Sequence, residues 1–174
     1  MRFTGAAFRA HDPRWSFSPL SGEGAALYGG RFNPKGRPAL YLSLGIVTAI
    51  KEISQGFAHK IDPCVLCEYA VDCLPIADLR TEGGRAQLGI QWEEMSCAWF
   101  SQVTQELEPA SWRLADGLIQ RGFAGLLSQS VAPGATSADH NLVLWQWGDD
   151  LPTQIRVHDP HARLPKDQSS WQSD

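Results

Sequence analysis

The chain has 174 residues and a mass of 19.2 kDa, which suits one domain and leaves little room for two. Hydrophobic residues make up 43% of it and charged residues 20%, which excludes an intrinsically disordered chain. No apolar run approaches the roughly 20 residues of a membrane-spanning helix, and no signal-peptide pattern opens the chain. We therefore expect a soluble cytoplasmic protein with no membrane contact, whose four cysteines stay reduced.

The net charge of −4 is unevenly distributed along the chain. Residues 1–60 carry eight basic and three acidic side chains, whereas the remainder carries seven basic and sixteen acidic ones. General nucleic-acid binding needs a broad basic face, so no direct contact with nucleic acid is expected. The pattern fits an anionic small molecule held by the N-terminal third, and it equally fits charges scattered over the folded surface.

The N-terminal third combines a long loop with a strand and a helix. A short apolar segment at residues 7–10 precedes a Gly-, Pro- and Ser-rich stretch over residues 12–36, and so long a loop inside a compact domain is usually functional. Residues 37–45 form a glycine-bounded apolar run typical of a strand. Apolar residues at spacings of three and four then predict a helix that ends near Gly56, with Glu52 on its flank. The apolar stripe consists of Ile46, Ala49, Ile50, Ile53 and Phe57.

The remaining chain is predicted to mix short strands with helices. Helical spacing covers residues 92–104 and 111–120, and the second helix has Ser111 as its N-cap and Gly122 as its stop. Irregular mixing of this kind predicts an α+β domain over residues 1–159, followed by an irregular C-terminal extension over residues 160–174. The predicted strands are residues 64–72, 76–79, 123–130 and 141–147, with 155–159 as an edge strand.

Residues 29–52 contain three chemically informative side chains. Arg31 follows two glycines, Tyr41 lies on the predicted strand, and Glu52 lies on the helix that folds back across that strand. The three side chains can therefore line the opening of the same cleft. Arginine offers a planar donor fork for phosphate, and tyrosine a face for stacking. A carboxylate stabilises the positive charge that develops as a glycosidic bond breaks. Taken singly, each residue type is common on a surface or in a core, so the spacing alone is a weak indication.

The run GGRFNPKGRPALYLS followed by TAIKE resembles the signature of the RES-domain family, the toxin halves of bacterial toxin–antitoxin pairs. The family is named for an Arg, a Glu and a Ser. The later segments GFAGLLSQSVAP and NLVLWQW resemble its second block, so the resemblance extends from about residue 8 to about residue 147. By position, the family's Arg, aromatic partner and Glu correspond to Arg31, Tyr41 and Glu52.

The family's serine is best matched by Ser130. The family usually has Tyr-Pro-Ser where this chain has Ser128-Gln129-Ser130, so Ser128 and Ser137 stay open as alternatives.

The resemblance implies a fold like that of the diphtheria-toxin-like ADP-ribosyltransferases, with two small mixed or antiparallel sheets that clasp NAD and are surrounded by helices. It also implies cleavage of the nicotinamide–ribose bond, with NAD as co-substrate and no metal. In that reaction Arg31 grips phosphate, Tyr41 stacks beside nicotinamide, Glu52 steadies the oxocarbenium-like ribose, and Ser130 orients the ribose or Glu52. Further candidates for holding the dinucleotide are Arg9, Asn33 and Lys35.

The acceptor of ADP-ribose is open at this point. Transfer to a protein makes the chain a mono-ADP-ribosyltransferase, whereas water or phosphate makes it an NAD glycohydrolase or phosphorylase that depletes NAD. The long N-terminal loop and the C-terminal tail are similar to the protein-modifying, ParT-like subgroup, for which the resemblance implies phosphoribosyl pyrophosphate synthetase as a target. It also implies an Xre-type helix-turn-helix antitoxin that occludes the active site.

The sequence also allows a non-enzymatic function, and it contains two pairs of residues of metal-binding type. A catalytically inactive module that only binds a partner is the non-enzymatic alternative, which the intact Arg31, Tyr41 and Glu52 disfavour. The C-x-x-C pair Cys64 and Cys67 lacks a second pair, so no zinc site is expected. His158 and His161 likewise lack supporting ligands and are typical of a surface.

Overall fold

The structure is a computed structural model that describes residues 1–54 and 62–169. The strands in these ranges are β1 (Phe3–His11), β2 (Leu40–Ser43), β3 (Val65–Cys73), β4 (Ile76–Asp78), β5 (Gly125–Gln129), β6 (His140–Leu144) and β7 (Thr153–Val157). The helices are α1 (Glu23–Tyr28), α2 (Ile46–Ser54), α3 (Glu82–Leu88), α4 (Trp92–Ser96), α5 (Trp99–Thr104) and α6 (Ala110–Gln120), with a 3-10 helix, η1 (Pro13–Trp15).

The strands form one continuous mixed sheet with the order β4-β5-β6-β2-β1-β3-β7. β4 and β5 run parallel, and the other neighbours are antiparallel. β1 and β2 pair at a single register position, Phe8 opposite Ser43, so the sheet has two halves that meet at this pair. The predicted α+β class is confirmed. The two small sheets expected within it are joined into one seven-stranded sheet, in which they correspond to the halves β4-β5-β6-β2 and β1-β3-β7.

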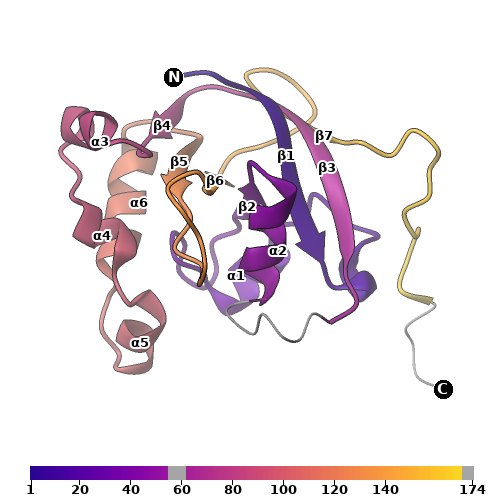
Figure 1. Cartoon of the computed structure of the whole chain (residues 1–174), viewed down its shortest axis with the longest axis horizontal. Coiled ribbons are helices and arrows are strands. Elements are labelled where there is room, and N and C mark those ends of the chain that lie inside the picture. The colour runs from indigo at the N-terminus through magenta and orange to yellow at the C-terminus, as the bar shows by residue number, and fades with distance from the viewer. Residues whose placement is uncertain (55–61, 170–174) are drawn as a thin grey trace.

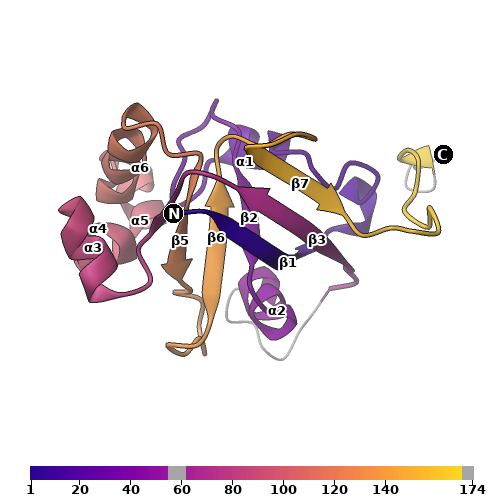
Figure 2. The ribbon, with the colours of Figure 1, turned by 90° about the horizontal axis from the view of Figure 1, so that it is seen from above.

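Two hydrophobic clusters hold the two halves of the sheet together and attach helices to it. The first contains Leu42 and Leu142 from one half together with Tyr69 and Ile155 from the other, so it joins the two halves. Side chains of the opposite face, which alternate with these along the strands, form the second cluster with α4 and α6. Figure 2 shows α3 to α6 together at one end of the sheet, opposite the C-terminal tail.

Helix α2 confirms the helix predicted from Ile46 onward, and its described part ends at Ser54. The predicted end near Gly56, and Phe57 of the apolar stripe, lie outside the described residues. The buried face of α2 differs from the expected stripe. Thr48 and Ala49 are buried, whereas Ile46 and Ile53 are exposed.

The polar contacts of α2 explain why its buried face differs from the predicted apolar stripe. The Thr48 hydroxyl and the Glu52 carboxylate both hydrogen-bond to residues on or beside the loop between β5 and β6. A buried hydrogen bond that is left unmade costs more than the exposure of part of an aliphatic side chain. The polar pair therefore faces the protein, and the isoleucines lie toward solvent.

Three other predictions are corrected. The stretch 12–36 is not wholly irregular, because it contains η1 and α1. The helix predicted over residues 92–104 is two helices, because Cys97 takes an extended conformation with ψ of 151°. Ser111 lies inside α6, whose N-cap is Pro109, so the predicted Ser111 cap is wrong. A proline fixes φ near −65° and suits the start of a helix, which explains the earlier start.

The remaining strand predictions agree with the structure. The segments expected as strands carry β2 to β6, and β7 lies at the edge of the sheet as expected. After β7, residues 158–168 run as turns and bends along the side of the molecule away from α3 to α6 (Figure 1). Within the described ranges, no helix has the length and apolar character needed to cross a bilayer.

His11 makes the stability of this fold depend on pH. It is buried in β1, where its Nε2 lies 2.6 Å from the Tyr69 hydroxyl. That hydroxyl donates to the main-chain oxygen of Pro19 at 2.9 Å, so it accepts from a neutral His11 that carries its proton on Nε2. Burial, and then the charge of Arg9, lowers the pKa of His11 to about 4, against 6.5 for an unperturbed histidine.

Acidification is therefore expected to destabilise the protein through His11. Between pH 6.5 and 4 the unfolded chain binds a proton that the folded chain excludes, so the free energy of unfolding falls as the pH falls, by up to about 3 kcal/mol. Urea unfolding of the wild type and of His11→Gln across this range measures the effect. The variant should lose the part of the slope that His11 supplies, and identical slopes for the two proteins would contradict the assignment.

Candidate active site

Arg31 lies at the tip of a tight turn between α1 and β2. The Gly30 amide donates to the Asn33 carbonyl at 2.9 Å, and these two residues form an isolated β-bridge around Arg31 and Phe32. Phe32 is buried in the second cluster and anchors the turn. A Cβ at Gly30 would lie 2.5 Å from the Tyr41 hydroxyl oxygen, so only glycine allows the turn to approach the strand this closely.

The Tyr41 hydroxyl fixes this turn from β2. It accepts from the Phe32 amide at 2.9 Å and donates to Asn33 Oδ1 at 2.7 Å. Burial raises the pKa of Tyr41 well above its usual range, so the hydroxyl stays protonated. Two indole groups add support, because Trp112 Nε1 donates to the Gly30 carbonyl and Trp145 Nε1 to the Phe32 carbonyl. The turn that carries Arg31 is thus held on several sides.

The Arg31 guanidinium is half-buried and only partly used by the protein. Its Nη1 donates to the carbonyls of Met95 at 3.0 Å and Cys97 at 2.7 Å, which the break between α4 and α5 leaves available. Burial lowers the pKa of Arg31, while Cys97, Glu52 and Tyr41 act in the opposite direction. The guanidinium stays charged, and its other N–H groups donate to no described residue. It can therefore bind an anion.

Glu52 is held on α2 by two donors. Its Oε1 accepts from Ser130 Oγ at 2.6 Å and from Asn141 Nδ2 at 2.5 Å. Ser43 Oγ donates to Asn141 Oδ1 at 2.9 Å, which fixes the amide so that its nitrogen faces Glu52. Oε2 accepts no hydrogen bond from the described residues. The result is a half-buried carboxylate in one orientation with one oxygen available to a ligand.

The structure brings four sequence-predicted residues to one place. Glu52 lies close enough to Arg31 to affect its pKa, as Tyr41 does, and Ser130 contacts Glu52 directly. Of the alternative serines, Ser128 is buried in β5 and Ser137 is exposed, and neither hydroxyl bonds to Glu52. These observations favour Ser130 as the counterpart of the family's serine.

Asn141 is a member of the site that sequence reasoning missed. It is the first residue of the run NLVLWQW and a polar residue at the start of an otherwise apolar strand, which is the signal that could have singled it out. Pairing of β6 with β2 places it opposite Ser43, next to the helix that carries Glu52.

Three further predicted residues do not join this cluster. Asn33 is fully buried, and its Nδ2 donates to three main-chain carbonyls, so it supports the turn and does not reach a ligand. Arg9 lies on the same face of β1 as the buried Ala7 and His11, and it donates to the Ser21 carbonyl. Lys35 is exposed beside the turn and forms no ion pair with the described residues.

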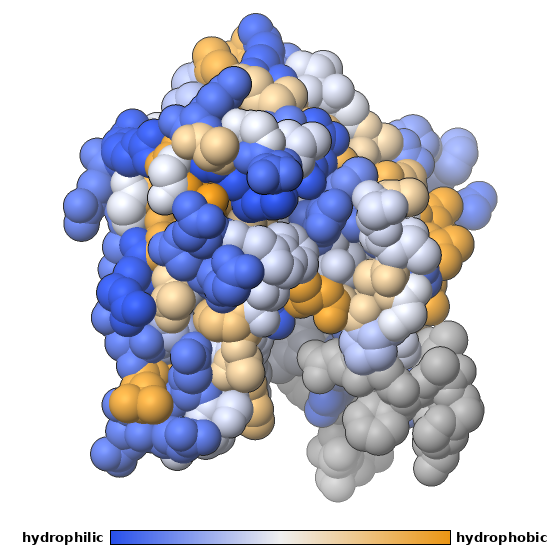
Figure 3. Space-filling model, turned by 60° about the vertical axis from the view of Figure 1, so that its left-hand side comes forward, coloured by the Kyte–Doolittle hydropathy of each residue, from blue (hydrophilic) through white to orange (hydrophobic). Residues whose placement is uncertain are grey.

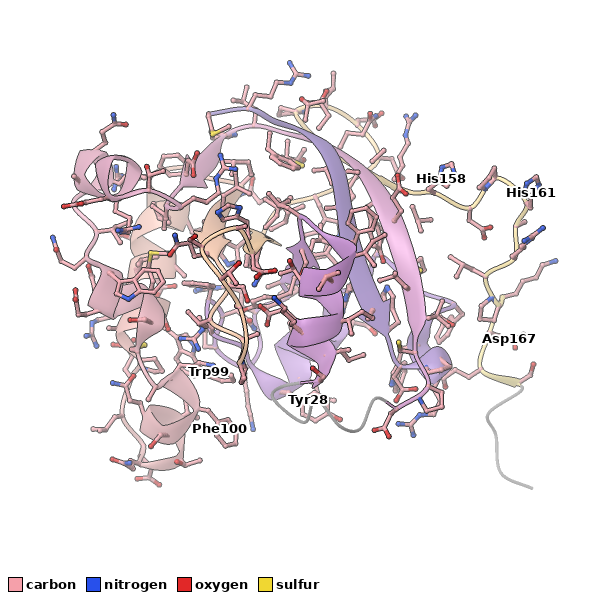
Figure 4. All side chains as sticks on the ribbon, in the orientation of Figure 1. Tyr28, Trp99, Phe100, His158, His161 and Asp167 are labelled. Carbon is pink, nitrogen blue, oxygen red and sulfur yellow. The ribbon has the colours of Figure 1, made fainter. Side chains whose placement is uncertain are left out.

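The described residues contain no group of three His, Cys, Asp or Glu side chains arranged to hold a metal ion. Cys64 is half-buried and Cys67 buried, and both are free thiols. His158 and His161 lie on the C-terminal tail, away from α2 (Figure 4). The candidate site is therefore the cluster of Arg31, Tyr41, Glu52, Ser130 and Asn141.

A comparison with protein-family models identifies the RES domain over residues 6–167 of the chain. The chain belongs to the RES domain family. This RES domain is similar in structure to a chain of the crystal structure of the M. tuberculosis MbcT–MbcA toxin–antitoxin complex. The TM-score is 0.63 at 20% sequence identity, and the match covers 91% of this chain and 84% of that chain. At this identity the likeness supports the fold. A search of curated proteins finds no match.

Removal of the Tyr41 hydroxyl is expected to loosen the turn of this RES domain. Tyr41→Phe leaves the Phe32 amide without its acceptor and Asn33 Oδ1 without its donor, and a buried group left unpaired costs about 1–3 kcal/mol. Urea unfolding measures the loss. Tyr28→Phe is the matched control, because the Tyr28 side chain is 74% exposed and its hydroxyl bonds to no described residue. Equal stability of the two variants would contradict the proposed role.

Proposed function

We propose that this RES domain is the toxin of a toxin–antitoxin pair, and that it cleaves the nicotinamide–ribose bond of NAD and transfers ADP-ribose to a protein. The observation that carries the proposal is the Glu52 carboxylate, which Ser130 and Asn141 orient beside the charged Arg31. An oriented carboxylate suits a positively charged, oxocarbenium-like ribose, and a guanidinium suits the diphosphate. Membership of the RES domain family supports the same chemistry.

The reaction needs stabilisation of charge and a leaving group that departs by itself. Nicotinamide leaves with the electron pair of the C1′–N bond, and positive charge develops on the ribose ring. Because Ser130 and Asn141 occupy Oε1, Oε2 of Glu52 is left to face that charge. A nucleophile of the acceptor then gives its electron pair to C1′ and releases its proton. Arg31 holds the diphosphate, and the ring of Tyr41 is the surface that we assign to nicotinamide.

A protein acceptor is the first choice within this proposal. The resemblance to the protein-modifying subgroup makes phosphoribosyl pyrophosphate synthetase the first target to test. Transfer to water or phosphate uses the same residues and differs only in the nucleophile, so experiment must separate these outcomes.

The proposed partner is a helix-turn-helix antitoxin of the Xre type that covers the site. The solved structure to which this RES domain is similar is that of a toxin–antitoxin complex. Exposed aromatic residues suit a protein partner, and Phe100 of α5 and Tyr28 of α1 are 67% and 74% exposed. Figure 4 shows them with Trp99 along the lower edge of the molecule, and Figure 3 shows hydrophobic side chains exposed among hydrophilic ones at the lower left of the surface.

The proposal is tested with purified protein and NAD that is labelled in the adenylate part. Nicotinamide release and label on protein are followed in buffer, with bacterial lysate and with purified phosphoribosyl pyrophosphate synthetase. Label on the synthetase or on one lysate protein supports the transferase and identifies its target. Release of nicotinamide without labelled protein identifies an NAD-consuming hydrolase or phosphorylase. No release in any mixture contradicts the enzymatic proposal.

A further inference from the structure

Asp139 connects helix α2 to the loop between β5 and β6. Its side chain is 11% exposed, and its two oxygens accept from Thr48 Oγ1 at 2.6 Å and from Lys51 Nζ at 2.9 Å. On the loop side, the carboxylate accepts from the amide and the hydroxyl of Thr136 at 2.8 and 3.0 Å. One carboxylate thus carries two contacts to the helix and two to the loop.

These contacts reach both partners of the hydrogen bond between Ser130 and Glu52. Thr48 precedes Glu52 by four residues, about one helical turn, so the two side chains lie on the same face of α2. On the loop side, the main-chain carbonyl of Asp139 accepts from the Ser130 amide at 2.8 Å. Asp139 therefore bonds to the helix that carries Glu52 and to the residue that donates to Glu52. Figure 1 shows this loop beside α2.

Apolar packing fixes the position of α2 only in part. Ile46, Val47 and Ile53 are 50%, 66% and 38% exposed, whereas the small Ala49 is buried and Ile50 is half-buried. The polar contacts of Thr48, Lys51 and Glu52 therefore help to set where the helix lies. Hydrogen bonds to an ionised carboxylate are among the stronger and more directional ones. Thr48 and then Lys51 hold the pKa of Asp139 far below its usual range, so it stays ionised.

We propose that Asp139 is a positioning residue for the reaction, which holds α2 against the β5–β6 loop so that the Glu52 carboxylate stays aligned with Ser130 and Asn141. Asp139 itself contacts no substrate. The proposal rests on the proposed function for its catalytic consequence, while the clamp between helix and loop can be measured without any reaction.

Two variants test the catalytic consequence. Asp139→Asn removes the charge that pairs with Lys51, and Thr48→Val removes one hydroxyl with little change of shape. A misplacement of a catalytic group by about 1 Å can cost roughly 100-fold in rate, so we expect kcat for nicotinamide release to fall about 10- to 100-fold. KM for NAD should stay within about twofold, because Arg31 and its turn are untouched.

The matched control is Asp159→Asn. Asp159 also accepts two hydrogen bonds, from the amides of Arg163 and Leu164, but it lies on the C-terminal tail. This variant should keep the wild-type kcat. Full activity of both Asp139→Asn and Thr48→Val would overturn the proposal.

A double-mutant cycle separates positioning from general damage. If Asp139 acts through Glu52, then Asp139→Asn should change the residual rate of Glu52→Gln by less than about twofold, because the two effects are not independent. Equal fold losses in the two backgrounds would show that Asp139 does not act through Glu52 and would overturn the proposal.

Hydrogen exchange distinguishes failure of this proposal from failure of the proposed function. In Asp139→Asn the amides of α2 should exchange faster than in the wild type, while those of the β1–β3 pair should not change. This measurement needs no NAD turnover. A wild-type protein that releases no nicotinamide contradicts the proposed function. Unchanged amide exchange of α2 in Asp139→Asn overturns the clamp whether or not the protein is active.

Discussion

Glu52→Gln is expected to reduce nicotinamide release on the order of 10²- to 10³-fold, the usual loss when one stabilising group is removed from a transition state. The glutamine oxygen can still accept from Ser130 and Asn141, so the geometry is kept while the charge that stabilises the ribose is lost. KM for NAD should change little, because the effect falls on the transition state. Steady-state measurement of nicotinamide release gives both constants.

Glu68→Gln is the matched control for this change. It is the same substitution on an exposed residue of β3, and it should leave the rate unchanged. Thermal unfolding should show that Glu52→Gln is folded. A folded Glu52→Gln protein with wild-type kcat is the result that the mechanism cannot accommodate.

Arg31→Ala is expected to weaken NAD binding and to raise KM about 10- to 100-fold. Hydrogen bonds to a charged group contribute about 1.5–3 kcal/mol, and each 1.4 kcal/mol corresponds to about a tenfold change in affinity. Arg31→Lys should be intermediate, because it keeps the charge but loses the planar fork that grips two phosphate oxygens. Titration of NAD in the same assay measures the change.

Arg113→Ala provides the comparison, because Arg113 also donates to a main-chain carbonyl, that of Glu108, but lies exposed on α6. It should leave KM unchanged. A fall in kcat at constant KM for Arg31→Ala would assign Arg31 to the chemical step and not to the phosphate contact.

Local patterns in the sequence predicted the part of the site that is local in the chain. The strand and helix around Tyr41 and Glu52 follow from their apolar spacing, and the short connection between them places both residues near Arg31. Asn141 and Ser130 lie 89 and 78 residues from Glu52, and they reach it only because β6 pairs with β2. No periodicity in the sequence specifies such a pairing.

Local patterns also failed where a polar residue serves the fold. Asn33, two residues after Arg31 in a glycine-rich loop, was expected to contact the dinucleotide, but its amide nitrogen donates to carbonyls in and around the turn. The Tyr41 hydroxyl is likewise used within the protein. The amphipathic stripe of α2 misjudged its buried face, because the hydrogen-bond partners of Thr48 and Glu52 come from a distant loop. Polarity alone does not separate a ligand contact from a buried support.

The long sequence separation between Glu52 and the two residues that orient it, Ser130 and Asn141, has a consequence for the newly made chain. Arg31, Tyr41 and Glu52 leave the ribosome early, but the groups that orient the carboxylate belong to β5–β6 and follow some eighty residues later. A chain interrupted before β6 therefore contains the charged residues without the scaffold that aims them. Synthesis itself thus delays the appearance of an assembled site until β6 has been made and has paired with β2.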